Sequence, residues 1–83
     1  MDGSASAYSR RGGLLVRIGR AEEGLSDLER AHELGRRSET LTFNRAVALQ
    51  ELGRCEEALA LIEGMTSAAA QELRARCDEQ SED

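Results

Sequence analysis

The sequence predicts an all-helical fold in which antiparallel helical hairpins stack side by side into a short α-solenoid of about five helices. The first observation is an internal repeat, because residues 19–25 (GRAEEGL) return 34 residues later as residues 53–59 (GRCEEAL). A period of this length is typical of stacked helix-turn-helix units. The other two observations are the dominance of Ala, Leu, Glu and Arg, which favour helices, and the complete absence of proline.

The repeat extends on both sides of the duplicated turn and preserves the size of the side chains. The aligned pairs are Gly12 with Ala46, Leu15 with Leu49, Ile18 with Leu52, Leu28 with Ile62, and Ala31 with Met65. Such a pattern indicates buried positions that recur in each unit. Stacked hairpins bind other molecules along a surface and not in a pocket, which favours recognition over catalysis.

The first helix is expected over residues 5–18, with Asp2 or Ser4 available as its N-cap. Its inward face is predicted to hold Tyr8, Gly12, Leu15 and Ile18. Gly12 allows a neighbouring helix to approach closely, whereas Gly13 has no evident packing role. Because a glycine in a helix interior costs about 1 kcal/mol relative to Ala, this helix is expected to be the weakest.

The second and third helices are expected over residues 21–34 and 39–52. Gly19 and Gly35 flank the second helix, and Ser38 caps the third, which stops at Gly53. The inward residues are expected to be Leu25, Leu28 and Ala31 in the second helix, and Leu41, Ala46, Ala48, Leu49 and Leu52 in the third.

The fourth helix is expected over residues 55–64 and a capping helix over residues 67–79, begun by Thr66 or Ser67. Their inward residues are expected to be Ala58, Leu59, Leu61, Ile62 and Met65 in the fourth, and Ala69, Ala70, Leu73 and Cys77 in the fifth. The thin apolar stripe of the fifth helix suits the end of a stack, where one face meets water. We therefore predict one domain made of a first hairpin, a second hairpin, a capping helix and a disordered acidic tail, over residues 5–38, 39–66, 67–79 and 80–83 of the chain.

Charge is distributed unevenly between the two halves of the chain. Residues 1–37 carry 7 Arg against 6 acidic residues, a net charge of +1, whereas residues 38–83 carry 4 Arg against 10 acidic residues, a net charge of −6. An acidic half repels phosphate backbones, and Tyr8 and Phe43 are the only aromatic residues for base stacking. We therefore expect no nucleic acid among the partners.

The cysteine and histidine content gives no metal or cofactor site. Cys55 and Cys77 lie 22 residues apart, and His32 is the single histidine, so the usual zinc-ligand sets cannot be built. A disulfide between the two cysteines is possible, but we expect free thiols in a reducing compartment. We interpret His32 as a solvated surface residue. With no signal-peptide pattern and no run of 18 apolar residues, we expect a cytoplasmic protein that does not interact with membranes.

The sequence contains no evident candidates for catalytic residues, and we expect that the protein is not an enzyme. The sequence contains no Ser-His-acid arrangement, glycine-rich phosphate loop, HExxH or CxxC motif. The adjacent pairs at residues 22–23 and 56–57 are glutamates in the first turns of helices, where they interact favourably with the helix dipole. Adjacent helical residues also point about 100° apart, which is unsuited to paired acid-base work.

With its 34-residue period, the chain resembles the tetratricopeptide repeat family over about two repeats and a capping helix. The matching residues are Tyr8 at the first-helix aromatic site, Gly12 and Ala46 at the small crossing site, Leu15 and Leu49, the turn glycines Gly19 and Gly53, Gly24 and Ala58, Leu28 and Ile62, and Ala31. The departures are Thr42 in place of an aromatic, Arg45 in place of Leu, Met65 in place of a small residue, and the missing proline.

The resemblance implies a protein-interaction module that binds an extended peptide or a helix along the concave face lined by the first helix of each hairpin. Phe43 and Val47 are four residues apart, so they share a helix face and are predicted to form an apolar anchor or, equally, to pack on a neighbouring helix. Around them the resemblance places the other candidate partner-binding residues, Asn44, Arg10, Val16 and Arg17.

Arg10, Arg17 and Asn44 could receive an acidic peptide, although solvated helix-face charges are the simpler interpretation of the arginines. The basic and Asn clamp of chaperone adaptors is incomplete here, since Ser9 and Gly13 occupy two of its sites. Two alternatives remain open. The chain is a self-associating structural or assembly subunit, or it is a fragment or splice form of a longer tetratricopeptide-repeat scaffold.

Overall fold

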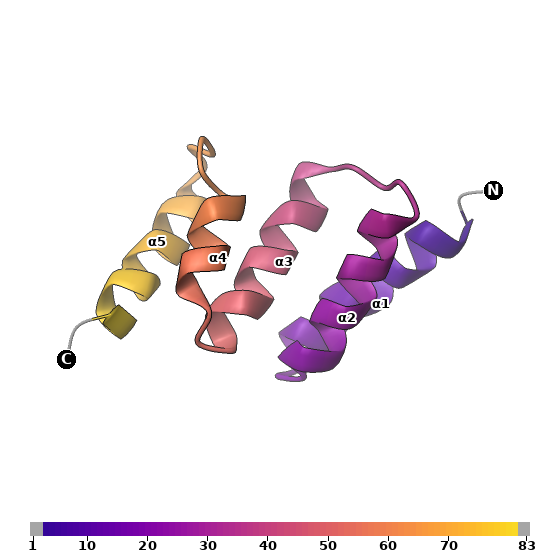
Figure 1. Cartoon of the computed structure of the whole chain (residues 1–83), viewed down its shortest axis with the longest axis horizontal. Coiled ribbons are helices and arrows are strands. Elements are labelled where there is room, and N and C mark those ends of the chain that lie inside the picture. The colour runs from indigo at the N-terminus through magenta and orange to yellow at the C-terminus, as the bar shows by residue number, and fades with distance from the viewer. Residues whose placement is uncertain (1–2, 82–83) are drawn as a thin grey trace.

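The computed structural model describes residues 3–81 and confirms the all-helical fold (Figure 1). Within these residues there are five helices and no strand. The helices are α1 (Gly3–Arg17), α2 (Ala21–Glu33), α3 (Glu39–Glu51), α4 (Cys55–Leu61) and α5 (Ala68–Ser81). The molecule is elongated, with principal extents of 45 × 25 × 18 Å, as a row of stacked helices requires.

The helices pack in chain order along the long axis, from α1 and α2 on the right of Figure 1 to α5 on the left. α1 contacts both α2 and α3, and α3 contacts both α4 and α5. In contrast, α2 and α4 have no Cα atoms within 8 Å of each other. The helices α1, α3 and α5 therefore form one layer whose members approach each other, while α2 and α4 lie apart in a second layer. This arrangement confirms the stacked hairpins.

The helix ends follow the expected signals. Gly19 and Gly53, the duplicated turn residues, have φ angles of 90° and 78°, a conformation that L side chains rarely adopt. Ser38 Oγ accepts a hydrogen bond of 3.0 Å from the backbone N–H of Leu41 at the start of α3. Ser67 Oγ likewise accepts one of 3.2 Å from Ala70 at the start of α5, so Ser67 and not Thr66 provides this contact.

Several helix boundaries differ from the expected ones. α1 begins at Gly3, two residues earlier than predicted, so Ser4 lies inside the helix and the prediction of Ser4 as its N-cap is wrong. α4 ends at Leu61, three residues earlier than predicted, and Arg74 of α5 then donates from Nη2 to the carbonyl oxygens of Ile62 at 2.9 Å and Met65 at 2.7 Å. These bonds satisfy carbonyls that a longer helix would have paired internally. α5 runs to Ser81, so only residues 82–83 of the expected disordered tail, together with the alternative N-cap Asp2, lie outside the described residues.

The core runs through all five helices. α1 and α2 approach each other closely at two glycines. A β-carbon on Gly12 would lie 2.9 Å from the carbonyl oxygen of Gly24, so a larger residue would not fit there without a shift. A β-carbon on Gly24 would lie 2.6 Å from Cγ2 of Val16. The predicted close approach at Gly12 is thereby confirmed. The largest fully buried side chains are Leu28, Leu41, Ile62, Leu73 and Cys77.

Two apolar residues expected on inward faces are exposed, namely Ala69 of α5 and Ile18 just after α1. Ile18 is 66% exposed, although its repeat equivalent Leu52 is half-buried and packs against the core. The prediction for Ile18 is wrong because α1 packs on α2 and α3 on one side and has no helix of the described chain on its other side. α3, in contrast, has neighbouring helices on both sides.

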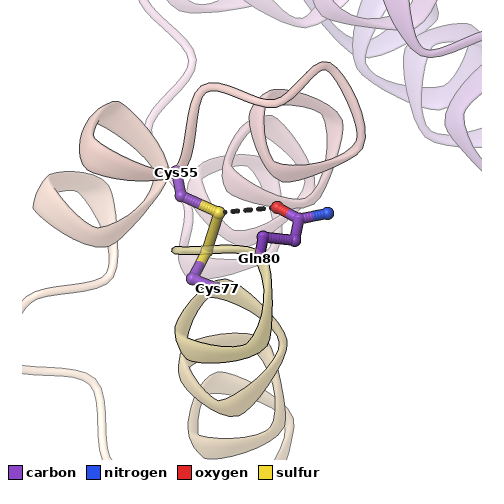
Figure 2. Close-up of a disulfide and its surroundings, with 3 residues drawn as sticks. All are labelled: Cys55, Cys77 and Gln80. Carbon is purple, nitrogen blue, oxygen red and sulfur yellow. Dashed lines mark hydrogen bonds between the residues drawn. A yellow bond between two sulfur atoms is a disulfide. The ribbon is translucent and has the colours of Figure 1, made fainter. Parts of the chain in front are cut away.

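The expectation of free thiols is also wrong, because Cys55 and Cys77 form a disulfide that joins the start of α4 to α5 (Figure 2). Their Cα atoms are 5.6 Å apart, within the usual range for a bridge. Gln80 lies against the bridge, with 2.9 Å between Oε1 and Cys55 Sγ. Because a bridged sulfur carries no proton, this contact is a donated hydrogen bond only in the thiol form or with the amide turned to donate through Nε2. Free thiols therefore no longer support the expectation that the protein is cytoplasmic.

Candidate functional site

The candidate site is the surface formed by the layer of α1, α3 and α5, which we call the inner surface. α1 supplies Arg10 and Arg17, and α3 supplies Phe43, Asn44 and Val47. Residues one turn apart on α3 project to the same side, so these three α3 side chains are neighbours. The contact between α1 and α3 sets the two groups beside each other.

Val16, which was expected on this surface, is buried, and so is its equivalent in the repeat. Val16 is only 5% exposed and packs against Gly24 of α2, so the prediction that it contacts a partner is wrong. Its repeat equivalent in α3, Gln50, is 7% exposed, and its Oε1 has no hydrogen-bond partner within the described residues. Val16 faces α2, the second helix of its own hairpin. The resemblance placed Val16 on the concave face, but Val16 lies where α1 and α2 approach each other, and this contact buries it.

Phe43 and Val47 are both half-buried, and each packs against the hydrophobic core while keeping part of its side chain at the surface. Phe43 therefore packs on a neighbouring helix, as one interpretation expected, and also keeps exposed surface, as an apolar anchor would need. A half-buried aromatic held by the core is a rigid contact surface, since little side-chain entropy remains to be lost on binding. A partner would reach the exposed parts of Phe43 and Val47, and not two freely projecting side chains.

Asn44 marks the junction between α1 and α3. A β-carbon on Gly13 would lie 3.1 Å from Asn44 Nδ2, so the absence of a side chain at Gly13 leaves room for this amide. Gly13 therefore has a packing role that the sequence did not reveal. Asn44 is half-buried, and no hydrogen bond of its side chain to another described residue is present, which leaves its donors and acceptor available at the surface.

Arg10 and Arg17 are exposed, and neither forms a hydrogen bond or an ion pair within residues 3–81. α1 contains three arginines and no acidic residue. The two guanidinium groups therefore contribute uncompensated positive charge along this edge of the inner surface. Such groups are suited to carboxylates, which they bind through paired N–H donors.

The third arginine of α1 forms an ion pair that the sequence analysis missed. Arg11 donates from Nε to Asp27 Oδ2 at 2.5 Å and from Nη2 to Oδ1 at 3.0 Å, and its guanidinium lies 5.6 Å from the ring centroid of Tyr8. These hydrogen bonds from Arg11 hold the pKa of the buried Asp27 carboxyl below its ordinary value. A usable signal existed, because Arg11 and Asp27 are equally distant from the turn at Gly19 and so lie opposite each other in the hairpin.

A second polar cluster joins α2 to α3. Arg37 Nη1 donates to the carbonyl oxygen of His32 at 2.7 Å and lies 3.2 Å from its Nδ1. His32 is half-buried and not fully solvated as expected. Partial burial, followed by the positive charges of Arg45 and Arg37, lowers the pKa of His32. Arg45 Nε is itself buried without a hydrogen-bond partner in the described chain, which follows from an Arg at a position where the repeat pattern favours Leu.

The first-turn glutamates pair with arginines in the same way in both hairpins. Arg20 and Glu23 form a two-point ion pair at the start of α2, and Arg54 and Glu57 repeat it at the start of α4, with Nε to Oε2 at 2.8 Å in the second pair. Hydrogen bonds from these arginines lower the pKa of Glu23 and Glu57. A general acid near neutral pH requires the opposite shift. Among the described residues, no group of three or more His, Cys, Asp or Glu is placed to hold a metal ion.

Comparison with known proteins gives no assignment. No protein-family model matches the chain, and no curated protein matches its sequence. No solved structure matches it either. The resemblance to tetratricopeptide repeats therefore rests on the duplicated residues of the sequence. None of the helices in residues 3–81 has the length and apolar character needed to cross a bilayer.

Proposed function

We propose that this chain is a non-enzymatic protein-interaction module of tetratricopeptide-repeat type, which binds a peptide of a partner protein along the inner surface. The observation that carries the proposal is the asymmetry of the two layers. α1, α3 and α5 contact one another in sequence, whereas α2 and α4 do not meet. A stack built in this way curves toward its closer layer, and stacked repeats use that concave side for binding.

The side chains on this layer favour an acidic peptide with an apolar residue. Phe43 and Val47 offer a supported apolar contact, and Asn44 beside them offers free amide donors. Arg10 and Arg17 add positive charge that no acidic group of α1 offsets. A peptide carrying carboxylates next to an apolar side chain would satisfy both parts of the surface, in the manner of charge-assisted hydrogen bonds flanking an apolar anchor.

The test is a selection from a random peptide library displayed on phage, with the complete 83-residue chain as the target. The selected peptides are expected to be enriched in Asp and Glu. Synthetic copies should bind the Arg17→Glu and Asn44→Asp variants at least about tenfold more weakly, because each change introduces like charge. Arg30→Glu on α2 is the control, since Arg30 is also an exposed arginine but lies in the other layer of helices.

Backbone amide shifts in NMR spectra would locate the bound peptide. Under the proposal, the largest changes fall around Gly13 and Asn44, at the junction of α1 and α3. A selection without enriched sequences, peptides that bind all three variants equally, or shift changes confined to α2 and α4 would each contradict it.

A further inference from the structure

A second surface of the molecule carries exposed apolar side chains that the proposed function does not use. Leu14 is 52% exposed and Ile18 is 66% exposed, and their spacing of four residues places them together on the side of α1 that faces away from α2 and α3. Ala7 lies two turns before Leu14 on the same side and is also exposed. We call Ala7, Leu14 and Ile18 the α1 outer face. Among the residues that the structure describes, the remaining exposed large apolar residue is Leu34, which stands alone just after α2.

The internal repeat shows what this face is shaped to receive. At an offset of 34 residues, Ala7 and Leu14 correspond to Leu41 and Ala48 of α3, and Ile18 corresponds to Leu52 just after α3. Leu41 is 1% exposed and Ala48 is 0% exposed, because α3 turns this side toward the preceding hairpin and packs on α2. The α1 outer face is therefore the counterpart of a helix-packing face, and no helix within residues 3–81 packs on it.

A hollow beside the α1 outer face supports this correspondence. It has a volume of about 230 Å³ and is lined by Ser4, Ala7, Tyr8 and Arg11. Ala7 lies in it at the position where α3 has the larger Leu41. An incoming helix can therefore place an apolar side chain above Ala7, in space that Leu41 fills at the equivalent site of α3.

Charge distinguishes between possible occupants of the α1 outer face. Arg10 and Arg17 flank Leu14 and have no partners within residues 3–81, and α1 has no acidic residue. Two copies joined through this face would bring four unpaired arginines together, which is unfavourable. A helix whose apolar stripe is flanked by Glu or Asp would instead pair with these arginines.

From these observations we infer that the α1 outer face is a docking site for an acidic amphipathic helix of a partner protein. The helix buries Leu14 and Ile18, places one apolar side chain above Ala7, and pairs its carboxylates with Arg10 and Arg17. This contact is of the helix-on-helix type and buries different apolar residues from peptide binding on the inner surface, since Phe43 and Val47 do not belong to the outer face. Both contacts draw on Arg10 and Arg17, so a helix at the outer face and an acidic peptide on the inner surface would compete for these two arginines.

The experiment uses two synthetic helical peptides of about 15 residues, long enough for a marginal helix. Both carry Leu at every third or fourth position on an Ala-rich background, one with flanking Glu and the other with flanking Lys. Fluorescence anisotropy measures their binding to the complete chain. The Glu peptide is expected to bind at least about tenfold more tightly than the Lys peptide, and the difference should shrink as salt is added.

The variant Leu14→Ser/Ile18→Ser is expected to lose at least about tenfold in affinity for the Glu peptide, because it removes two partly exposed apolar side chains from the contact. Leu34→Ser is the matched control and should change affinity by less than about twofold, since Leu34 is also an exposed leucine but does not belong to the α1 outer face. Ile18→Glu serves as a second variant if the double change lowers helicity, because Ile18 follows the end of α1 and is already largely in water.

Three outcomes would overturn the inference. The first is equal binding of the Glu and Lys peptides, and the second is unchanged affinity of the outer-face variants. The third is a concentration-dependent dimer in sedimentation that Ile18→Glu abolishes, since a second copy would then occupy the face. Asn44→Asp separates the two proposals: it should leave binding of the Glu peptide unchanged, and a loss there would assign the peptide to the inner surface instead.

Discussion

Two adjacent glycines in α1 are expected to respond in opposite ways to the same substitution. Gly12→Ala places a β-carbon 2.7 Å from Cγ of Leu28 and 2.9 Å from the carbonyl oxygen of Gly24. Leu28 is 0% exposed, and the second contact is backbone, so neither neighbour can move aside cheaply. Gly13→Ala meets only Asn44 Nδ2, at 3.1 Å, at the end of a half-buried side chain that can shift.

The magnitudes follow from two opposing effects. Replacing glycine with alanine in a helix interior stabilises the helix by about 1 kcal/mol. Overpacking a tight contact costs about 1–3 kcal/mol. Gly12→Ala should therefore destabilise the protein by about 1–2 kcal/mol, whereas Gly13→Ala should stabilise it by roughly 0.5–1 kcal/mol. A difference of about 2 kcal/mol corresponds to roughly 10 °C in Tm for a domain of this size.

The assay is urea unfolding followed by circular dichroism at 222 nm, with the disulfide intact in every sample. Equal m-values would show that the variants unfold between comparable states. The reasoning about the α1–α2 crossing would be refuted if Gly12→Ala were as stable as the wild type or if both substitutions changed stability in the same direction.

Three further predictions concern single contacts. Reducing the Cys55–Cys77 bridge, which spans 22 residues, should lower the free energy of unfolding by about 3 kcal/mol. Denaturation with and without a phosphine reductant measures this loss, and an unchanged denaturation midpoint would contradict the prediction. Because Arg11 holds the pKa of Asp27 below its unfolded value, this ion pair stabilises the fold above about pH 4, and the stabilisation is lost as the pH falls through the folded pKa. Asp27→Asn should therefore make the free energy of unfolding depend less on pH in the acid range. If the substitution leaves that pH dependence unaltered, the ion pair is not its cause. Ser38→Ala should cost about 1 kcal/mol by removing the cap of α3, measured by thermal unfolding, and a loss below a few tenths would show that the 3.0 Å bond contributes little.

The helices and their ends were predictable because their signals are local. Gly19 and Gly53 end α1 and α3 through their own backbone conformations, and Ser38 caps α3 through a residue three positions away. Such effects depend on a few neighbouring residues and need no knowledge of the tertiary structure. The same applies to Gly12, since the repeat aligns it with the small residue Ala46.

The errors arise where distant residues decide the outcome. Ile18 and Leu52 are equivalent in the repeat, but only Leu52 has a helix on that side. The bridge between Cys55 and Cys77 depends on a distance of 5.6 Å between Cα atoms that no local pattern records. Of the candidate site, Arg10 and Arg17 lie at the surface as expected, whereas Val16 is buried because the crossing at Gly24 draws α2 against it.

The segment that joins the two hairpins has a consequence for how this molecule could change in size. Residues 34–37 are exposed and lie between α2 and α3, so a further hairpin could be inserted there without disturbing a helix. Since each hairpin meets only its immediate neighbours, duplicating one unit at this point would lengthen the row without rebuilding either end. Adding a hairpin, or removing the first one, would thus change the length of the protein while the Cys55–Cys77 disulfide between α4 and α5 stays in place.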